Sequence, residues 1–554
     1  MFPYNLIFMI TQNKNTKMKA QSFFKALSSA SVIKKTALLS LASVILLGQT
    51  GCEKFLEKDP TFIVKENYYN NETDVNIGLA GIYDIMGKEE VYGGALLLDL
   101  NVADDGFYSR SAFTIGTAVY NFDASTSTVS NLWRFLYEGI ERANVFLSRV
   151  DQVQMPEANK AAAKGEAKFL RAYYHFLLVS NWGDIPLKTV PTSSVNDINI
   201  KRTPQREVYD FIVKEMEEAE GLVKTATQLG AGGRVSKSAV RGVLARVYLK
   251  MAGAPLNDVS KYAEALKWAR KIVYPDNGPK EHRLNPDFKQ IFINYAADKY
   301  DIGESIWEVE FFGNRGGDFE AGRVGNTMGL QCNDEAFGYG YGFINATPKL
   351  YARYGATDTR RDWTIAPYQY VYNNVNNLQV VRDSTFWTSA QLYNRNCGKY
   401  RRVYEVVKPK NKNYTPMNFP LLRYADVLLM LAEAENEVNG PTSVATAALK
   451  EVRDRASATD VTSLATSKEE LRRLIREERF LELAFEGIRK FDLIRWDVFT
   501  SEMNQLARDI QNTAPTTFRF AALAGTNVTL RHNLLPIPVL ELSLNNGMTQ
   551  NQGW

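Results

Sequence analysis

The feature that most constrains the fold is the C-terminal stretch 419–496, in which apolar residues recur at helical spacing. One helix is predicted in RYADVLLMLAEAENE, where Ala425, Ala432 and Ala434 are small enough for a neighbouring helix to approach closely. A second helix is predicted to run unbroken from an N-cap at Ser467, with Glu470 completing a capping box, to Trp496. An amphipathic helix must cover its apolar stripe, so this stretch predicts helices stacked in pairs.

The second predicted helix carries acidic residues among its apolar ones. Glu478 falls on its apolar stripe, and burying a carboxylate there requires a cationic partner. Glu477, Glu482 and Glu486 alternate with basic residues and are predicted to form salt bridges along the helix. The basic residues concerned are Arg476, Arg479, Arg489 and Lys490.

Six segments resemble one family of proteins. They are RYADVLLMLAEAENE, EVRDRA, EERFLELAFEGIRKFDLIRW, the terminal LLPIP and MTQNQGW, and, earlier, NLWRFLYEGIERANVFL (131–147) and GEAKFLRAYYHFLLVSNWGDIPL (165–187). Taken in their order along the chain, they resemble the SusD/RagB family of Gram-negative surface lipoproteins. The resemblance implies a scaffold of four tetratricopeptide-like helix pairs, mapped here onto 131–180, 205–252, 260–274 with a neighbour, and 421–485. It also implies capture of a nutrient for a SusC-like TonB-dependent outer-membrane transporter, over which such proteins act as a hinged lid.

The N-terminus is interpreted as an export signal. Lys34 and Lys35 precede the apolar run ALLSLASVILLG, which is too short to span a bilayer, and Gly51-Cys52 resembles a lipobox. Cys52 is therefore the predicted lipidation residue, and Met18 is an alternative translation start. The predicted location is the outer membrane, lipid-anchored and exposed at the cell surface.

The net charge argues against nucleic-acid binding. The full chain carries a formal charge of +4, but residues 1–51 hold six lysines and no acid, so a chain starting at Cys52 has +4 − 6 = −2. A nearly neutral protein lacks the basic surface on which nucleic-acid binding depends.

The chain is divided into five parts. These are a signal peptide (1–51), a lipidated tether (52–60), an N-terminal helical scaffold (61–275), an irregular region (276–419) and C-terminal scaffold helices with a tail (420–554). The fold class is mainly α. Residues 281–420 hold 25 of the 65 aromatic residues in 140 positions, with many glycines and asparagines, so this region is predicted to bind the ligand.

Sugar binding needs aromatic faces and hydrogen-bonding side chains, and several residues fit this description. In FGYGYGF (337–343), rings alternate with glycines and would share one face of a strand. The predicted ligand-binding residues are Phe107, Tyr108, Asn314, Arg315, Tyr339, Tyr341 and Trp387. By contrast, Trp133, Trp268 and Trp496 lie on predicted helices and are assigned to packing.

The sequence gives weaker support for catalysis or metal binding. Glu308 and Glu310 would lie on one face of a strand and are the pair named for a surface glycoside hydrolase, the less favoured alternative. The adjacent Asp104 and Asp105 would diverge in an extended chain. Three scattered histidines, with His175 interpreted as a core residue, give no metal or cofactor motif. The segment DTRRDW (358–363) is interpreted as an ion-pair cluster rather than a site for an anionic sugar. Cys332 and Cys397 are either a disulfide or two buried thiols.

The sequence therefore predicts a binding protein without catalysis or cofactor. Its expected ligand is an oligosaccharide, and a peptide is the main alternative within the same family. A purely structural repeat protein is the third possibility, against which the aromatic-rich region argues.

Overall fold

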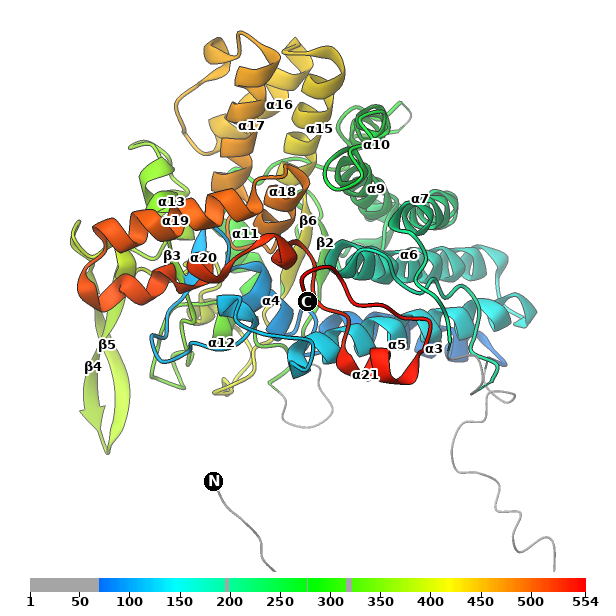
Figure 1. Cartoon of the computed structure of the whole chain (residues 1–554), viewed down its shortest axis with the longest axis horizontal. Coiled ribbons are helices and arrows are strands. Elements are labelled where there is room, and N and C mark those ends of the chain that lie inside the picture. Colours follow the sequence, from blue (N-terminus) through cyan, green and yellow to red (C-terminus); the bar gives the residue numbers. More distant parts are fainter. Residues whose placement is uncertain (1–68, 195–198, 277, 315–320) are drawn as a thin grey trace, which may run out of the picture. The chain divides into compact units, whose positions relative to one another are not determined.

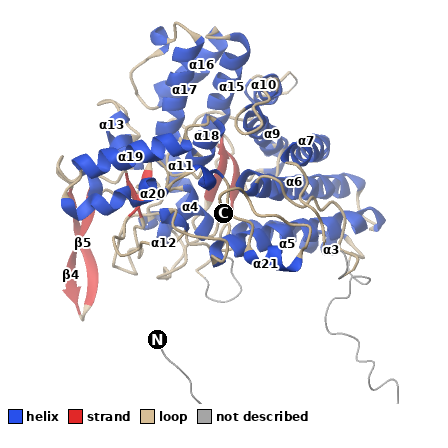
Figure 2. Ribbon diagram, in the orientation of Figure 1, coloured by secondary structure: helices blue, strands red, loops and turns tan. Residues whose placement is uncertain are grey.

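The structure is a computed structural model that describes residues 69–194, 199–276, 278–314 and 321–554. The predicted signal peptide, Cys52, the tether and Arg315 lie outside the described residues. Residues Tyr69–Trp554 form one compact unit, and Figure 2 shows that it is built mainly from helices. This confirms the predicted fold class.

The described helices follow one another along the chain in the order that Figure 1 labels. They are α3 (Glu72–Gly87), α4 (Ala95–Leu100), α5 (Ser127–Arg149), α6 (Glu157–Trp182), α7 (Gln205–Leu222), α8 (Ala226–Leu229), α9 (Lys237–Ala252), α10 (Lys261–Val273), α11 (Phe288–Ala296), α12 (Val324–Thr327), α13 (Pro348–Arg353), α14 (Arg361–Thr364), α15 (Tyr424–Asn439), α16 (Ser443–Arg455), α17 (Lys468–Glu482), α18 (Arg489–Arg495), α19 (Phe499–Thr513), α20 (Leu523–Asn527) and α21 (Val539–Leu544).

The long helices form the scaffold by packing on their neighbours in sequence. Contacts join α5 to α6, α6 to α7, α7 to α9 and α9 to α10, and α10 then packs on α15, which contacts α16 and α17. The small residues Ala425, Ala432 and Ala434 of α15 are fully buried, as close helix packing requires. Trp133 and Trp268 are also buried, on α5 and α10, and His175 is buried in α6. The first two predicted pairs are present as α5–α6 and α7–α9, α10 packs on α15, and the fourth predicted range, 421–485, holds α15, α16 and α17.

The predicted single helix from Ser467 to Trp496 is wrong. The Ser467 hydroxyl does cap α17, accepting from the Glu470 amide at 3.1 Å, but α17 ends at Glu482 and α18 begins at Arg489. Phe485 and Gly487 between them take left-handed backbone angles, with φ of 63° and 71°. The Phe485 amide donates to Asp105 at 3.2 Å and the Gly487 amide to Asn101 at 3.1 Å. Hydrogen bonds to a distant loop therefore replace the helical ones that periodicity predicts.

In the described part of the chain, distant cations and not Arg476, Arg479, Arg489 or Lys490 pair with Glu477, Glu478, Glu482 and Glu486, so these predicted salt bridges along the helix are wrong. Glu478 bonds Arg360 at 2.6 Å, which confirms that it requires a cation. Glu482 contacts Arg360 and Arg423, each at 2.9 Å. Arg423 also reaches Glu304 and Glu486 at 2.7 and 2.8 Å. All these side chains are buried, so the network ties the irregular region to the C-terminal helices.

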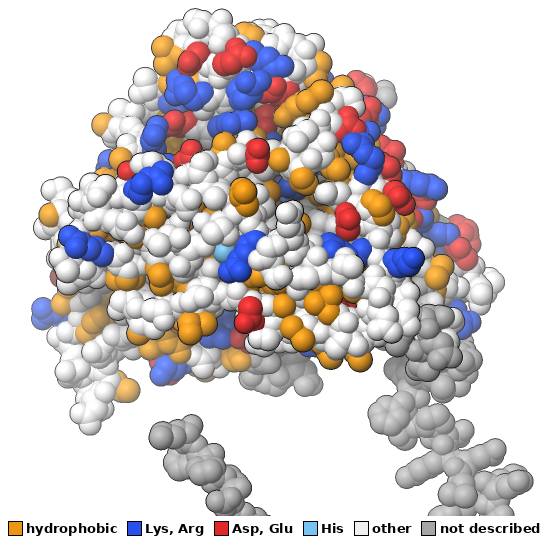
Figure 3. Space-filling model, in the orientation of Figure 1, with side chains coloured by type: hydrophobic (Ala, Val, Ile, Leu, Met, Phe, Trp, Pro, Cys, Tyr) orange, Lys and Arg blue, Asp and Glu red, His pale blue; other side chains and the backbone are white. Residues whose placement is uncertain are grey.

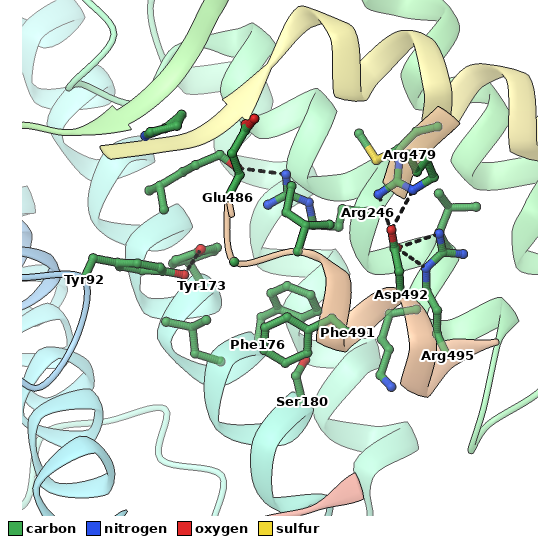
Figure 4. A pocket seen from close by; sticks show the side chains of 18 of the residues that line it. Tyr92, Tyr173, Phe176, Ser180, Arg246, Arg479, Glu486, Phe491, Asp492 and Arg495 are labelled. Atoms are coloured by element: carbon green, nitrogen blue, oxygen red, sulfur yellow. Dashed lines mark hydrogen bonds and ion pairs between the residues drawn. The ribbon is translucent and has the colours of Figure 1, made fainter. Parts of the chain in front are cut away.

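A second cluster of buried ion pairs lies deeper in the scaffold. Figure 4 shows Asp492 between Arg479 and Arg495, with nitrogen–oxygen distances of 2.7 and 2.8 Å. Arg479 also reaches Asp426 of α15 at 2.7 Å, and Arg495 pairs with Glu433. The cluster fastens α15, α17 and α18 to one another.

Strands are short and occur in antiparallel pairs. They are β1 (Gly106–Tyr108), β2 (Ser305–Val309), β3 (Ile344–Ala346), β4 (Tyr368–Val375), β5 (Leu378–Phe386) and β6 (Phe419–Arg423). β1 pairs with β3, β2 with β6, and β4 with β5. The β4–β5 hairpin projects at the lower left of Figure 1. Its turn residues Asn376 and Asn377 have φ of 50° and 64°, as a two-residue type I′ turn requires.

Two further sequence questions are answered by the described residues. Cys332 and Cys397 are buried free thiols, so the disulfide alternative fails. Among the residues that the structure describes, none of the helices combines the length and the apolar character needed to cross a bilayer.

Candidate functional site

Two hollows differ sharply in what they can hold. The cavity in Figure 4, between Tyr92, Phe176, Arg246 and Phe491, has a volume of only about 60 Å³ and lies inside the scaffold. Ligand sites in proteins usually measure about 300–1,000 Å³. Hollows of about 820, 640, 440 and 320 Å³ meet that size. The last of these, a cleft beside the β4–β5 hairpin, is the candidate functional site because of the residues that line it.

Rings, amides and one cation line the cleft, and they come from segments far apart in the sequence. The lining residues are Ser109, Arg110, Leu330, Gln331, Asn333, Asn345, Tyr368, Gln369, Tyr370, Tyr372, Trp387, Asn394, Asn396 and Phe518. Aromatic faces cover the apolar side of a sugar ring, while amides both donate to and accept from its hydroxyls. The lining therefore suits a polyhydroxylated ligand.

The hairpin supplies most of the rings because side chains alternate along a strand. Tyr368, Tyr370 and Tyr372 are two residues apart on β4 and so point to the same side. Burial raises the pKa of Tyr372 to about 12, so its hydroxyl stays protonated at neutral pH. The backbone N–H of Trp387 donates to the Pro367 carbonyl at 2.8 Å, which places the indole at the base of the hairpin.

The segment 331–334 holds the hairpin in position. The backbone N–H of Asn333 donates to the Tyr372 hydroxyl at 3.2 Å, and its side-chain amide donates to Gln379 at 2.6 Å. The Asp334 carboxylate accepts from the Val381 amide at 2.9 Å. These bonds join both strands of the hairpin to the body, so the tyrosines have a fixed place in the cleft wall.

Backbone pairing brings the amides of the opposite wall together. Asn345 lies on β3 opposite Phe107, and it also forms a bridge with Asn396. The Asn396 side chain donates to the side-chain oxygen Oδ1 of Asn345 at 2.6 Å and accepts from the backbone N–H of Gln331 at 3.2 Å. Each amide is oriented by its neighbour, which is the pre-organisation that a binding site needs.

A row of rings lies next to the cleft. Tyr339 packs edge-on against Tyr341 at 5.2 Å, Tyr341 stacks on Phe343 at 5.0 Å, and Phe343 stacks on Tyr108 at 5.4 Å. The Arg110 guanidinium lies 5.2 Å from the Phe343 ring centre and also lines the cleft. The row and the cleft therefore meet at Arg110.

The predicted platform FGYGYGF is correct in part. Tyr339, Tyr341 and Phe343 do form one row, but the segment is not a regular strand, and Phe337 leaves the row to pack on Tyr370 at 5.1 Å. Gly338 has a φ of 135°, which turns the backbone between Phe337 and Tyr339. The expectation of four rings on one face is corrected to three.

The other predicted ligand residues divide. Trp387 lines the cleft, whereas Phe107 is 2% exposed, packed between Tyr393 and Phe520, and is out of reach of any ligand. Tyr108 is half-buried within the ring row. Asn314 donates to the Pro409 carbonyl at 2.7 Å. The prediction that Phe107 contacts the ligand is therefore wrong.

The loop that carries Phe107, 102–113, also holds Asp104 and Asp105. Asp104 pairs with Arg489 at 2.6 Å and with Lys349 at 2.7 Å. Burial and the neighbouring Asp104 raise the pKa of Asp105 to about 7. Both acids bind residues of the turn after α17 or of α18, so their role is structural.

The carboxylates considered for catalysis lie elsewhere, in a groove between α3 and β2. Glu308 is 3% exposed, and its oxygens accept from Ser305 and from Asn418, the latter at 2.9 Å. Burial raises the pKa of Glu308 to about 7. Glu310 is exposed just past the end of β2. Since both oxygens of Glu308 are already engaged, the pair does not present an acid and a nucleophile to a glycosidic bond.

Of the residues that line the cleft, the sequence predicts only Trp387 as a ligand contact. Tyr368, Tyr370 and Tyr372 lie in the irregular region, where their alternation and the Asn376-Asn377 turn are the pattern of a hairpin. Phe518 and Arg110 come from opposite ends of the chain, and nothing local in the sequence pairs them.

The fold and this cleft define a class: a helical-repeat scaffold that carries a ring- and amide-lined binding cleft. The profile of the SusD family matches residues 303–554, and a profile described as "Starch-binding associating with outer membrane" matches residues 54–249. The chain therefore belongs to the SusD family. The family model is described as starch-binding and as associating with the outer membrane, so carbohydrate binding is the function of the family.

Individual relatives span nearly the whole chain. SusD-like protein P25 of Formosa agariphila is 27% identical over 543 residues, covering 89% of this chain and 94% of its own length. A solved SusD homolog from Bacteroides thetaiotaomicron is 27% identical with a TM-score of 0.79, covering 88% of this chain and 98% of its own. Surface glycan-binding protein A of the same organism, solved with laminarihexaose, shares the fold at 20% identity and a TM-score of 0.65, covering 87% and 100%.

Proposed function

We propose that this protein captures an oligosaccharide in the cleft beside the β4–β5 hairpin and releases it intact. The observation that carries the proposal is the lining itself: Tyr368, Tyr372 and Trp387 provide rings, while Asn345 and Asn396 provide oriented amides. A relative of the same fold was solved with laminarihexaose, a glucan fragment, which supports a glycan as the ligand class.

The test is electrophoresis of the purified protein through gels that contain single polysaccharides, with reducing ends assayed in the same samples. A matching glycan is expected to retard the wild type without releasing new reducing ends. Trp387→Ala is expected to lower the affinity by about tenfold or more, because a buried aromatic contact is worth about 1.5 kcal/mol or more. Tyr300→Ala is the control, since Tyr300 is 46% exposed and does not line the cleft.

The outcomes separate the alternatives. Retardation that Trp387→Ala removes and Tyr300→Ala preserves supports capture in the cleft. Release of reducing ends would overturn the non-enzymatic proposal, and Glu308→Gln would then show whether that groove is responsible. Absence of binding to every glycan, together with binding of peptides, would move the ligand class to peptides.

We further propose that the captured glycan passes to a SusC-like TonB-dependent transporter in the outer membrane, over which the protein acts as a lid held by lipidated Cys52. Membership of a family described as associating with the outer membrane supports this proposal. A tagged protein is expected to co-purify with a β-barrel transporter from detergent extracts. Cys52→Ala is expected to release the protein into the soluble fraction, and a transporter absent from the wild-type extract would count against the lid.

A further inference from the structure

We infer that the cleft selects acidic glycans, whose carboxylate or sulfate groups are attracted by arginines that have no carboxylate partner. This inference rests on the proposed glycan capture and specifies the class of glycan. It follows from the charges and hydrogen-bond donors that surround the cleft, taken in turn below.

Arg110 is the one charged side chain among the described residues that line the cleft. Its guanidinium donates to the Ser109 hydroxyl at 2.5 Å and to the carbonyl oxygens of Tyr341 and Gly342. Neutral acceptors hold the group in place but leave its charge uncompensated. The charge therefore remains available to a ligand.

Two more arginines, behind the cleft wall, also lack a carboxylate partner. Arg395 is 4% exposed and donates to the carbonyl of Thr388 at 3.1 Å and that of Trp387 at 3.5 Å. Arg401 is 8% exposed and donates to the carbonyls of Gly398 and Asp362, each at 2.9 Å. Within residues 69–194, 199–276, 278–314 and 321–554, neither they nor Arg110 form an ion pair with a carboxylate.

Arg401 is coupled directly to a ring of the cleft. Its guanidinium lies 5.5 Å from the centre of the Tyr368 ring and 3.4 Å from the Tyr368 hydroxyl, which it reaches through Nη1. The other side of the guanidinium covers Trp363 at 3.9 Å. A cation stacked beneath a lining ring adds positive potential at the surface that the ligand would touch.

The nearby acids do not cancel these charges. Asp334 accepts from the Phe337 and Val381 amides behind the hairpin, and the exposed Asp383 on β5 follows Arg382. Glu335 and Asp362 are nearby as well, but they pair with Lys412 and Arg361, so the charges of Arg110, Arg395 and Arg401 are not cancelled. A cleft with low-dielectric walls focuses such a field.

The hydrogen-bond inventory also favours an acceptor. Trp387 Nε1 and Arg395 Nε are buried donors without a partner in the described part of the chain. The Tyr368 hydroxyl accepts from Arg401 Nη1 and keeps its own O–H to donate. A sugar hydroxyl both donates and accepts, whereas a carboxylate or sulfate only accepts, so an acidic glycan matches this surplus of donors.

The experiment titrates the purified protein with polysaccharides matched in backbone and differing in charge. Polygalacturonate is compared with its methyl ester for the carboxylate source, and dextran sulfate with dextran for the sulfate source. One acidic member is expected to bind about tenfold or more tightly than its uncharged partner. Raising NaCl from roughly 50 to roughly 500 mM is expected to remove most of that difference, because the Debye length then falls to a few ångströms.

Variants of Arg110 test the origin of the preference. Arg110→Gln is expected to weaken the acidic ligand about tenfold, whereas Arg110→Lys, which keeps the charge, should restore most of the affinity. Arg134→Gln is the matched control, since Arg134 is a 56% exposed side chain on α5. Equal losses in both Arg110 variants, with no salt dependence in the wild type, would overturn the inference.

The outcomes also distinguish this inference from the proposed function. Binding of an uncharged glycan such as laminarin, with both acidic polymers ignored, would overturn the acidic preference and leave glycan capture standing. Failure of every glycan, charged or uncharged, would overturn both.

Discussion

Arg423 in the scaffold reaches three carboxylates, those of Glu304, Glu482 and Glu486, whereas Arg401 beside the cleft reaches carbonyl oxygens, a tyrosine hydroxyl and two rings. Both guanidinium groups are buried. In the network around Arg423 each charge is compensated by the protein, so these ion pairs serve packing and register. At the cleft the compensation is incomplete, and a ligand would complete it.

The surfaces of the two regions differ in the same way. Figure 3 shows acidic and basic side chains interspersed over the upper part of the molecule, where Figure 1 places α15–α17. The hairpin at the lower left is drawn almost entirely in white, as uncharged groups. Paired charges thus accompany the packed helices, while rings and amides accompany the cleft.

Arg423→Met should have the largest effect, because it leaves buried carboxylates without their cation. We expect a loss of about 3–5 kcal/mol in the free energy of unfolding, measured by urea denaturation. Arg473→Met is the control: Arg473 is a 54% exposed side chain paired with Glu470 at 3.1 Å, and its loss should cost less than about 1 kcal/mol. Similar values for both variants would contradict the assigned role of the network.

Acid should act on the scaffold in a defined window. Neighbouring arginines outweigh burial and hold the pKa of Asp426 and of Glu433 at about 2, below the usual range near 4. Between pH ~4.5 and ~2 the unfolded chain binds more protons than the folded chain, so stability falls as pH falls, by roughly 2 kcal/mol for each group. Glu433→Gln should flatten the pH dependence of unfolding in that window. An unchanged profile would contradict the assignment.

Phe518→Ala should affect binding more than folding. Phe518 lines the cleft and stacks on Tyr393 at 5.7 Å, while Phe520 belongs to the same cluster but does not line the cleft. We expect about tenfold weaker glycan binding by calorimetry for Phe518→Ala, or ~1.4 kcal/mol. Phe520→Ala should lower the melting temperature with little change in affinity. Equal affinities in the two variants would remove Phe518 from the site.

Ser467→Ala should have the smallest effect. The hydroxyl caps α17 through one hydrogen bond of 3.1 Å, and such a cap is worth about 1 kcal/mol. Urea denaturation should show that loss with glycan affinity unchanged, since α17 lies outside the cleft. A change in affinity would mean that the scaffold and the cleft are coupled.

How much the sequence could predict follows the same division. The scaffold helices can be predicted from the local periodicity of their apolar residues, and α15 with its buried alanines is as predicted. The break after Glu482 is not local, because the left-handed turn at Phe485 and Gly487 depends on Asp105 and Asn101, almost four hundred residues away. Propensity alone favours the unbroken helix there.

The cleft is harder to predict for a physical reason. Trp387 was identified because a tryptophan in a polar stretch is conspicuous. Arg110, Asn345 and Phe518 meet only through tertiary packing, so no spacing in the sequence relates them. Phe107 is the opposite case. An aromatic residue beside acidic ones is predicted to contact a ligand, but its ring is buried in a hydrophobic cluster.

Hydroxyl-radical footprinting with and without a bound oligosaccharide tests the location of the site most directly. We predict that the ligand slows oxidation of Trp387, Tyr368 and Tyr372, while Tyr300 and Tyr274, which are 46% and 48% exposed outside the cleft, react as before. Protection of residues elsewhere, with these three rings unaffected by a ligand known to bind, would contradict the assignment of the cleft.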